Sequence, residues 1–413
     1  MSESLDGERE AWLALASVPG VGEHTFQRLV EARGSATRVL EASRDGSLRR
    51  TPPMDASGRR LRSEVLAAIE AVAARPGSSR VIIEAHGVWV LTPLDREYPA
   101  RFDVLPAPPP VIYGWGERAA LDRARAVAVV GTRRPTPAGR LLAARLARRL
   151  VDLQATVISG LAFGIDGAAH SATVEAGGQT VAVIAGGHAE PGPRAHRGLV
   201  ASIVQSGGAV ISEVPPPVTP EKGSFPRRNR LIAALADATI VVEAPARSGA
   251  LNTAHHALEQ GRPLFVAPGR PGDPSVAGCL RLIRETPARP LVGDSELVED
   301  LVRIFAARAE TPPDAGPARG ASGPTVDLVL AELGPVERIV ATTIATQPGT
   351  LDDLVVSTGL APGTLAGAVS LLHLRGLVRL HGASVLPAGV LLDAGGASAR
   401  SGPPRLPPSG RLW

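Results

Sequence analysis

A repeating alternation of apolar segment, glycine turn and helix runs from residue 126 to residue 269 and most constrains the fold. The apolar segments read AVAVVG (126–131), TVISG (156–160), TVAVIAGG (180–187), AVISE (209–213), TIVVEA (239–244) and PLFVAPG (263–269). Because they are apolar along nearly their whole length, we expect strands buried on both faces, which is typical of a parallel sheet covered by helices. Between them lie helical patterns such as AGRLLAARLARRLVDL and GALNTAHHALEQG. The sequence therefore predicts an α/β fold with a doubly wound, mostly parallel, Rossmann-like sheet.

Segments of different composition flank this alternation and suggest domain boundaries. The predicted parts are a small helical domain (1–75), the sheet domain (76–306), a linker (307–323), a winged-helix-like domain (324–388) and a disordered tail (389–413). The sheet domain should open with strands in VIIEAHGVWVL, from Val81 to Leu91. A proline-rich, extended approach then leads to the alternation, because each proline disfavours helix in the residue before it.

The two flanking domains carry weaker signals of nucleic-acid binding. VPGVG, Val18 to Gly22, sits between two predicted helices, and glycines with positive φ at Gly20 and Gly22 would suit a helix-hairpin-helix (SAM-like) turn that exposes N–H groups to a phosphate. A plain glycine turn in a helical bundle explains the same pattern. In the C-terminal domain, VDLVLAELG, TLDDLVVSTGL and TLAGAVSLLHLRG predict three helices, and the third would be the recognition helix. That helix is poor in basic residues, so a protein-binding or regulatory role is at least as well supported.

The global composition excludes some classes of protein. The formal net charge is only +4, and Lys222 is the only lysine, so local clustering of arginine has to carry any nucleic-acid hypothesis. Cys279 is the only cysteine, which excludes an internal disulfide and a cysteine metal site. The N-terminus is acidic, and no run of apolar residues is long enough to span a membrane. We therefore expect a cytoplasmic protein without a membrane partner.

Ligands of an open α/β sheet bind beyond the carboxyl ends of the strands, and four turns of this chain collect there. GTRRPTPAGR (131–140) starts a helix whose free N–H groups suit an anion, and EAPARSGALNTAHHALEQG (243–261) offers Arg247 with Ser248 as the helix cap. SGLAFGIDGAAH (159–170) is a third glycine turn into a helix. The fourth, KGSFPRRNR (222–230), is the stretch of the chain densest in groups that bind phosphate and stack on bases, with three arginines, a lysine and a phenylalanine.

The KGSFPRRNR stretch combines groups that bind phosphate with a group that stacks on bases. Arginine presents a planar fork of donors to a phosphate, and Phe225 offers a face to an unpaired base. Single-stranded nucleic acid offers both features. A basic helix start on the protein surface is the alternative interpretation of the same residues.

Signals of catalysis are weak. Asp166 and His170 stand four residues apart and could form an acid/base couple or half a metal site, but Asp166 as a partner of the turn and His170 in a structural network are the favoured interpretation. The GTRR turn is not GxGxxG and no acidic residue follows at ribose distance, so NAD or FAD is not expected. No nucleophile with a base and no ligand set for a metal stands out, and we predict no cofactor.

Taken in order, GTRR, SGLAFGIDGAAH, TVAVIAGG, ISE, FPRRNR, SGALNTA with LEQGR, and VAPG closely resemble the DNA-processing protein A (Smf) family of bacterial natural transformation. The resemblance covers residues 95–285 and includes the DREYP approach. It implies an extended Rossmann fold that binds and protects single-stranded DNA, helps to load a RecA-type recombinase, works as a homodimer and performs no catalysis. N-terminal helical and C-terminal winged-helix-like domains also occur in this family.

Carried over to this chain, the resemblance implies a DNA-binding role for Gly131, Arg133, Arg134, Gly160, Lys222, Phe225, Arg227, Asn229 and Arg230. From the chemistry of the residues themselves we add Arg228, Arg247 and Ser248. We expect DNA phosphates along this arginine edge, a base against Phe225, and Asn229 orienting the loop.

The chain also departs from the family pattern. Phe163 stands where the family usually has an arginine, which would remove a phosphate contact or replace it with stacking. GHAEPGPRAHRGLV lacks the usual Tyr-Pro, and Cys279 and ETPA replace residues on the expected dimer side. The rival hypothesis is a nucleotide-processing enzyme resembling lysine-decarboxylase-like phosphoribohydrolases, but His256 falls where their glutamate would stand. A purely structural adaptor would leave the arginine edge unexplained.

Overall fold

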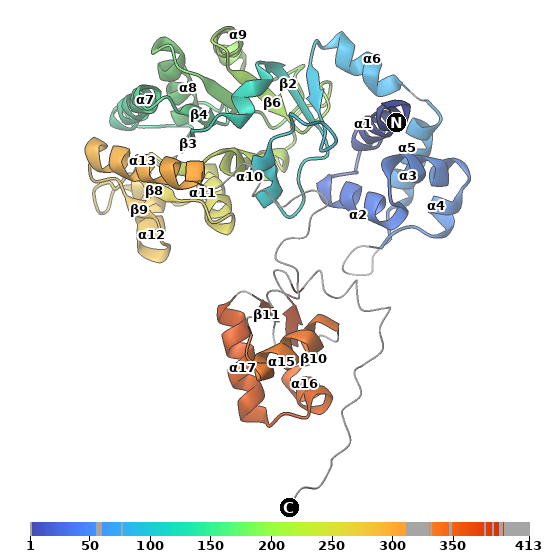
Figure 1. Cartoon of the computed structure of the whole chain (residues 1–413). Coiled ribbons are helices and arrows are strands. Elements are labelled where there is room, and N and C mark those ends of the chain that lie inside the picture. Colours follow the sequence, from blue (N-terminus) through green and yellow to red (C-terminus); the bar gives the residue numbers. More distant parts are fainter. Residues whose placement is uncertain are drawn as a thin grey trace, which may run out of the picture. The chain divides into compact units, whose positions relative to one another are not determined.

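The computed structural model describes residues 2–54, 60–75, 77–310, 330, 333–346, 349–375, 377–381, 384–387 and 391. The chain divides into two compact units, Met1–Pro312 and Pro313–Trp413. Each unit has its own buried core. The first unit holds the predicted sheet and the N-terminal helices (Figure 1).

A nine-stranded sheet forms the centre of the first unit, with strand order β1-β2-β6-β5-β4-β3-β7-β8-β9. The strands from β6 to β9 run parallel, while β1 and β2 pair in antiparallel fashion at one edge. The prediction of a doubly wound, mostly parallel sheet is thus confirmed. The strands are β1 (Trp89–Leu91), β2 (Ile112–Gly116), β3 (Ala126–Val130), β4 (Thr156–Ser159), β5 (Thr180–Val183), β6 (Ala209–Ser212), β7 (Ala238–Val241), β8 (Leu264–Val266) and β9 (Arg289–Pro290).

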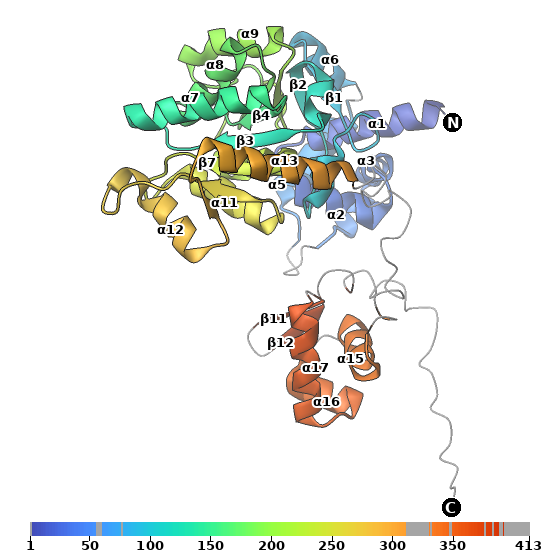
Figure 2. The ribbon, with the colours of Figure 1, turned by 60° about the vertical axis from the view of Figure 1, so that its left-hand side comes forward.

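Helices cover both faces of this sheet (Figure 2). On one face lie α7 (Pro137–Asp152), α8 (Ile165–Glu175), α9 (Arg197–Gln205) and α13 (Asp294–Glu310), and on the other lie α10 (Ser224–Leu235), α11 (Gly249–Glu259) and α12 (Ala277–Glu285). Successive residues of β3 alternate between the two cores, with Val127 and Val129 on the α7 side and Ala126, Ala128 and Val130 on the α10 side. This alternation explains why the strand is apolar at every position.

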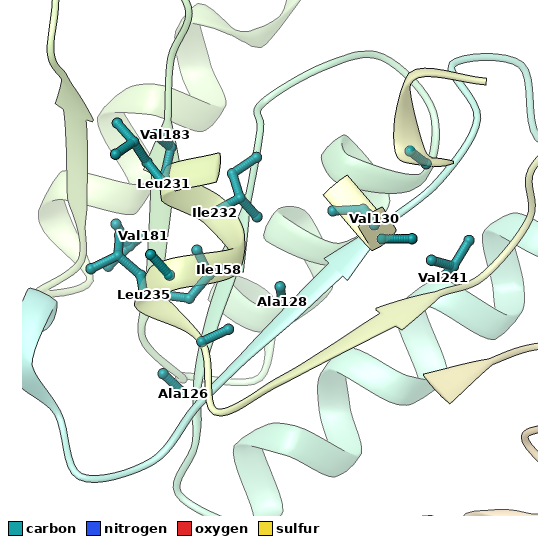
Figure 3. Packing of buried hydrophobic residues seen from close by; sticks show 14 of the residues in the cluster. Ala126, Ala128, Val130, Ile158, Val181, Val183, Leu231, Ile232, Leu235 and Val241 are labelled. Atoms are coloured by element: carbon teal, nitrogen blue, oxygen red, sulfur yellow. The ribbon is translucent and has the colours of Figure 1, made fainter. Parts of the chain in front are cut away.

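Helix α10 packs its apolar side directly on the strands. Figure 3 shows Leu231 and Leu235 of α10 close to Val181 and Val183 of β5, with Ile232 nearer to β3. All of these side chains are fully or almost fully buried. Burial of this kind contributes roughly 1.5–3 kcal/mol for each large aliphatic side chain. The packing fixes where the amino-terminal turn of α10, which carries the FPRRNR residues, lies relative to the strand ends.

The strand order places a topological switch point between β3 and β7. From β3 the chain passes through β4 and β5 to β6 on one side, and then returns to form β7 and β8 on the other side of β3. At such a reversal the loops that leave the two central strands diverge and open a crevice at their carboxyl ends. The loops in question are 131–136 and 242–248.

The N-terminal helices pack into the same compact unit as the sheet. They are α1 (Ser2–Ala16), α2 (Glu23–Arg33), α3 (Ala36–Arg44), α4 (Ser47–Arg50), α5 (Ser63–Ala73) and α6 (Ser78–Ala85). In the turn between α1 and α2, Gly20 has the expected positive φ of 86°, whereas Gly22 is extended with φ of −84°. The domain boundary after residue 75 stays a prediction.

The expectation of strands throughout residues 81–91 is wrong for the first half of that segment. Residues 81–85 belong to α6, and only β1 is a strand. The helix begins after Gly77, whose φ of 80° suits glycine, and it packs Ile83 against Val88 and Val90. Tertiary packing therefore outweighs the β preference of the Val-Ile-Ile run.

The second unit is a winged-helix-like domain, as predicted. It comprises α15 (Pro335–Thr346), β10 (Gly349–Thr350), α16 (Leu351–Thr358), α17 (Pro362–Leu374), β11 (Val378–His381) and β12 (Ser384–Pro387), with sheet order β10-β12-β11. α16 and α17 match two predicted helices, but α15 was not predicted. Most of the first predicted helix of this domain (326–334), the linker beyond Glu310 and nearly all of the predicted tail lie outside the described residues, and 307–310 are the end of α13.

Among the described residues, no single helix has both the length and the apolar composition to cross a bilayer. α16 and α17 reach that length and composition only as a pair, and they bend by 112° at the break between them.

Candidate nucleic-acid interface

A pocket of about 420 Å³ lies at the switch point, beyond the carboxyl ends of β3 and β7. We call it the switch-point pocket. It is formed by the loops after these two strands, the turn after β4, and the amino-terminal parts of α10 and α11. Of the predicted site residues, Gly131, Arg133, Arg134, Phe225, Arg228, Asn229, Arg247 and Ser248 line this pocket. Ala162 and Asp166 of the SGLAFGIDGAAH turn line it as well, so all four sequence turns predicted to meet at the strand ends meet here.

The predicted anion site at the amino terminus of α7 is filled from within the protein. Thr136 caps α7, and its backbone N–H and hydroxyl both donate to the buried carboxylate of Glu243, the hydroxyl at 2.6 Å. The N–H of Gly139 in turn donates to the Thr136 hydroxyl. A Cβ at Gly139 would lie 2.1 Å from Glu243 Oε2, so only glycine fits there. The expectation of free N–H groups at this helix end is wrong, because Glu243 already occupies it.

The amino terminus of α11 is different, because its first turn contains no acidic residue. Ser248 caps the helix by accepting from the N–H of Ala250 at 3.3 Å, and both Ser248 and Gly249 line the pocket. Asn229 of α10 donates to the carbonyl of Gly249 and to Asn252 Oδ1, at 3.3 and 3.2 Å. Asn229 thus orients this turn, as expected, and leaves a positive helix end facing the pocket.

Arg133 and Phe225 join two walls of the pocket. The Arg133 guanidinium lies over the Phe225 ring, with its carbon 4.9 Å from the ring centroid, which is a cation–π geometry. Arg134 and Arg247 are exposed beside this pair. Within the part of the chain that the structure describes, the side chains of Arg133, Arg134 and Arg247 form no ion pair. Their charge is therefore available to a ligand.

Arg228 lies beneath the pocket rather than on its rim. It is 5% exposed, and its guanidinium donates to the carbonyls of Gly160 (2.8 Å) and Val183 and, through Nε, to Asn229 Oδ1. Burial lowers the pKa of Arg228 to about 10, so it stays charged at neutral pH. The structure thus places this predicted DNA contact where it braces two strand ends and Asn229.

Asp166 faces Arg228 across Gly160. Its carboxylate accepts from the N–H groups of Gly160 and Ala162 at 3.2 and 3.4 Å, which confirms that it stabilises the turn. Burial raises the pKa of Asp166, while Arg228 and these N–H groups oppose the increase. A Cβ at Gly160 would approach both Arg228 and Asp166 within 3.0 Å. Gly160 therefore makes room for the buried pair.

His170 belongs to a structural network, as the favoured interpretation predicted. Its Nδ1 lies 2.7 Å from the hydroxyl of Thr180, which itself donates to the carbonyl of Val157. Burial lowers the pKa of His170 to about 3, so the imidazole is neutral at physiological pH. Among the described residues, no group of three or more His, Cys, Asp or Glu side chains is placed to hold a metal ion.

Arg227 and Arg230 lie on the opposite side of α10 from the pocket and are paired with carboxylates. Arg227 contacts Glu23 of α2 at 2.5 Å and Glu213 at 3.5 Å, while Arg230 contacts Glu213 at 2.5 Å and Glu23 at 3.6 Å. Arg227 remains 44% exposed, whereas Arg230 is 11% exposed. Burial raises the pKa of Glu213, and the two arginines oppose this increase.

The remaining predicted residues lie around the pocket. Lys222 is exposed just before α10, and Gly131 packs against Ile165, which a Cβ would approach to 2.5 Å. Sequence reasoning missed Glu23, Glu213 and Glu243 as partners. Glu243 lies near the carboxyl end of a predicted strand and could have been suspected, but no local pattern signals that Glu23 reaches a helix about two hundred residues later.

Comparison with known proteins supports the assignment of this fold. The family model described as DNA recombination-mediator protein A matches residues 89–302. A putative DNA processing protein DprA of Mycobacterium tuberculosis is 37% identical over 79% of this chain and 83% of the relative. Protein Smf of Synechocystis is 34% identical over 70% and 77%, respectively. The solved structure of DNA processing protein A from Streptococcus pneumoniae superposes with a TM-score of 0.57 at 27% identity, covering 73% of this chain and 98% of that one.

These matches confirm the resemblance inferred from GTRR, FPRRNR and the other motifs. The family model spans the strands and turns that build the switch-point pocket. The chain is therefore a member of the DNA recombination-mediator protein A family.

Proposed function

We propose that this protein is a recombination mediator that binds single-stranded DNA in the switch-point pocket. The observation that carries the proposal is the set of unpaired groups at one pocket: Arg133, Arg134 and Arg247, the stacked ring of Phe225 and the open end of α11. Arginines grip phosphates, and an aromatic face binds any base, so this combination suits a flexible single strand without demanding a sequence.

Each group in the pocket has its own role in the proposal. A phosphate sits at the amino terminus of α11, where Ser248 and the helix dipole accept negative charge and Arg247 neutralises it. A base stacks on the ring of Phe225, whose other face is held by Arg133. Arg228 and Asn229 act as positioning residues, because both are buried and hold the turns that carry the contact groups.

Fluorescence anisotropy with a labelled oligothymidine across a salt series tests this function. We expect binding to weaken steeply with salt, by a slope of about 0.7 for each phosphate neutralised. Duplex of the same sequence should bind more weakly, because its bases cannot reach Phe225. The double variant Arg133→Glu/Arg247→Glu should lose binding, while Arg303→Glu, a charge reversal on the exposed face of α13, serves as the matched control. Equal affinity for duplex, or unchanged affinity of the double variant, would overturn the proposal.

Family membership supports a finer role in recombination. On this basis the protein protects the bound strand, acts as a homodimer in the cytoplasm and helps to load a RecA-type recombinase, as in natural transformation. We expect it to accelerate strand exchange by such a recombinase on strands coated with single-strand-binding protein. Size-exclusion chromatography with light scattering measures the dimer. A monomer at micromolar concentration, or no acceleration of strand exchange, would remove the respective part of this role.

The proposal includes no catalysis. The pocket carboxylate, Glu243, is engaged by Thr136, and Asp166 is engaged by backbone N–H groups and faces Arg228. The rival hypothesis of a phosphoribohydrolase needs a glutamate in α11, where this chain has His256 paired with Glu259. Incubation with nucleoside monophosphates should release no free base, as followed by chromatography.

A further inference from the structure

Phe163 is exposed to solvent in the loop between β4 and α8. The exposed fraction of Phe163 is 49%, and no other Phe, Tyr or Trp in the described part of the chain is as exposed to solvent. The chain contains few aromatic residues, and those that the structure describes are otherwise buried or half-buried. A large apolar ring that is exposed to water does not gain the free energy that its burial would provide. Such exposure is typical of a surface that binds a ligand or another macromolecule.

The loop that carries Phe163 is held in a defined shape. Leu161 has a φ of 58°, which is uncommon for a residue with a side chain, and its carbonyl lies 3.0 Å from Nδ1 of His196. The His196 ring meets the Phe163 ring edge to face, with centroids 5.1 Å apart. His196 therefore supports one side of the ring, while about half of the Phe163 side chain stays free.

The Phe163 loop is continuous with the switch-point pocket. Ala162 lines the pocket, and the N–H of Ile165 donates to the carbonyl of Thr132, the residue before Arg133. Gly164 packs so closely on this turn that a Cβ there would lie 2.3 Å from the same carbonyl. Phe163 thus lies between two residues that adjoin the pocket wall, at the carboxyl end of the neighbouring strand β4.

Two arginines lie close in sequence to His196, the residue that contacts the Phe163 ring. Arg194 and Arg197 stand on either side of His196 in the sequence, and both are exposed. Neither forms an ion pair within the residues that the structure describes. An exposed aromatic ring beside unpaired arginines repeats the combination found in the pocket, where Phe225 lies with Arg133 and Arg247.

We propose that Phe163, supported by His196 and flanked by Arg194 and Arg197, is a second base-stacking site that continues the path of single-stranded DNA away from the switch-point pocket. We call these four residues the Phe163 site. The inference rests on the proposed function, since it extends the strand from Phe225 across the carboxyl ends of β4 and β5. One unpaired base stacks on the open face of Phe163, and the adjoining phosphates are neutralised by the arginines.

The experiment compares a short oligothymidine that fills only the switch-point pocket with a longer one that spans both sites. Phe163→Ala should weaken binding of the long oligonucleotide by about tenfold, the loss expected for one base stack, and leave the short one unchanged. Phe163→Trp should retain affinity, and its added fluorescence, relative to wild type, should be quenched by the long strand alone. Phe163→Leu keeps apolar contact but lacks the aromatic face, so it should bind as weakly as Phe163→Ala. Val302→Ala, on α13 with 50% exposure, is the matched control.

The arginines give an independent readout. In the double variant Arg194→Ser/Arg197→Ser, the salt slope for the long oligonucleotide should fall by about 0.7 for each arginine, without a change for the short one. If Phe163→Ala binds both lengths as wild type does, the Phe163 site is overturned while the proposed function stands. If wild type binds neither length, the proposed function itself fails. Equal weakening of both lengths would show that Phe163 merely supports the pocket.

Discussion

The arginines of the switch-point pocket and those of α10 differ in what already surrounds them. Arg133, Arg134 and Arg247 carry no ion pair in the described part of the chain, although their stretches are sparser in arginine. The FPRRNR helix start has three arginines, yet Arg228 is buried and Arg227 and Arg230 share the carboxylates of Glu23 and Glu213.

This difference teaches that density of charge in the sequence does not measure charge available to a ligand. Arg228 bonds to backbone carbonyls with Asp166 nearby, and the Arg227 and Arg230 charges are balanced by two carboxylates. We infer that the α10 arginines mainly place the turn that carries Phe225, whereas the pocket arginines bind the strand. Substitutions can distinguish residues that position the Phe225 turn from residues that bind DNA.

The largest effect is expected for Arg228→Ala. Removing this side chain leaves the Asp166 carboxylate buried without its neighbouring positive charge and frees two strand-end carbonyls, so the free energy of unfolding should fall by about 3–5 kcal/mol. Urea denaturation followed by circular dichroism measures it. Arg133→Ala should stay within about 0.5 kcal/mol of wild type as the exposed control. An Arg228→Ala protein as stable as wild type would refute the structural role.

Lowering the pH should reduce the free energy of unfolding through the buried side chain of His170. The pKa of His170 is about 3 in the folded protein because burial disfavours its charge, against about 6.5 when unfolded. The unfolded chain therefore binds a proton that the folded chain does not, so stability is lost as pH falls below about 6.5, by up to about 1.4 kcal/mol per pH unit.

Unfolding of the wild type and of His170→Asn at pH 7 and at pH 5 isolates this contribution. We expect the wild type to lose about 2 kcal/mol more than the variant over this interval. Identical losses in the two proteins would assign the acid sensitivity to other groups.

Phe225→Ala should weaken the binding of oligothymidine by about 1–3 kcal/mol, because one stacked base loses its aromatic partner. The half-buried ring packs against Arg133, so folding should change little, and the thermal unfolding midpoint checks this. Phe225→Tyr keeps the aromatic face and should bind like wild type. If Phe225→Tyr is as weak as Phe225→Ala, stacking is not the role of this ring.

The smallest effect is expected for Glu23→Gln. This change removes a carboxylate from the half-exposed Arg227 and makes its charge available to DNA, so affinity should rise by about 0.2–1 kcal/mol and the salt slope by about 0.7. Glu31→Gln, on the same helix α2 and bonded to Gln27, is the control. Weaker binding by Glu23→Gln would instead mean that Glu23 holds α10 in its binding position.

The sheet could be predicted because its information is local. β3 to β8 follow apolar segments bounded by glycine, and the switch point follows from their connections. The helix at residues 78–85 could not be predicted, since the same Val-Ile-Ile run suits a strand until Ile83 finds its place beside Val88 and Val90.

The site was predictable in location but not in the state of each side chain. Its pocket lies where the four predicted turns converge, and Asn229 orients the α11 turn as expected. The pairing of Arg227 with Glu23 and the filling of the α7 end by Glu243 depend on contacts between distant segments. No sequence pattern within ten or twenty residues of Arg227, or of the amino terminus of α7, encodes these contacts.

Lys222 gives this arginine-rich surface a practical property. It is the only lysine of the chain, it is exposed, and it lies two residues before the helix that carries Phe225. Amine-directed reagents read out by peptide mapping, which separates Lys222 from the α-amino group, therefore report on one side chain beside the proposed DNA path. A dye or crosslinker placed there needs no engineered residue, and protection of this single amine by a bound strand maps occupancy of the native protein.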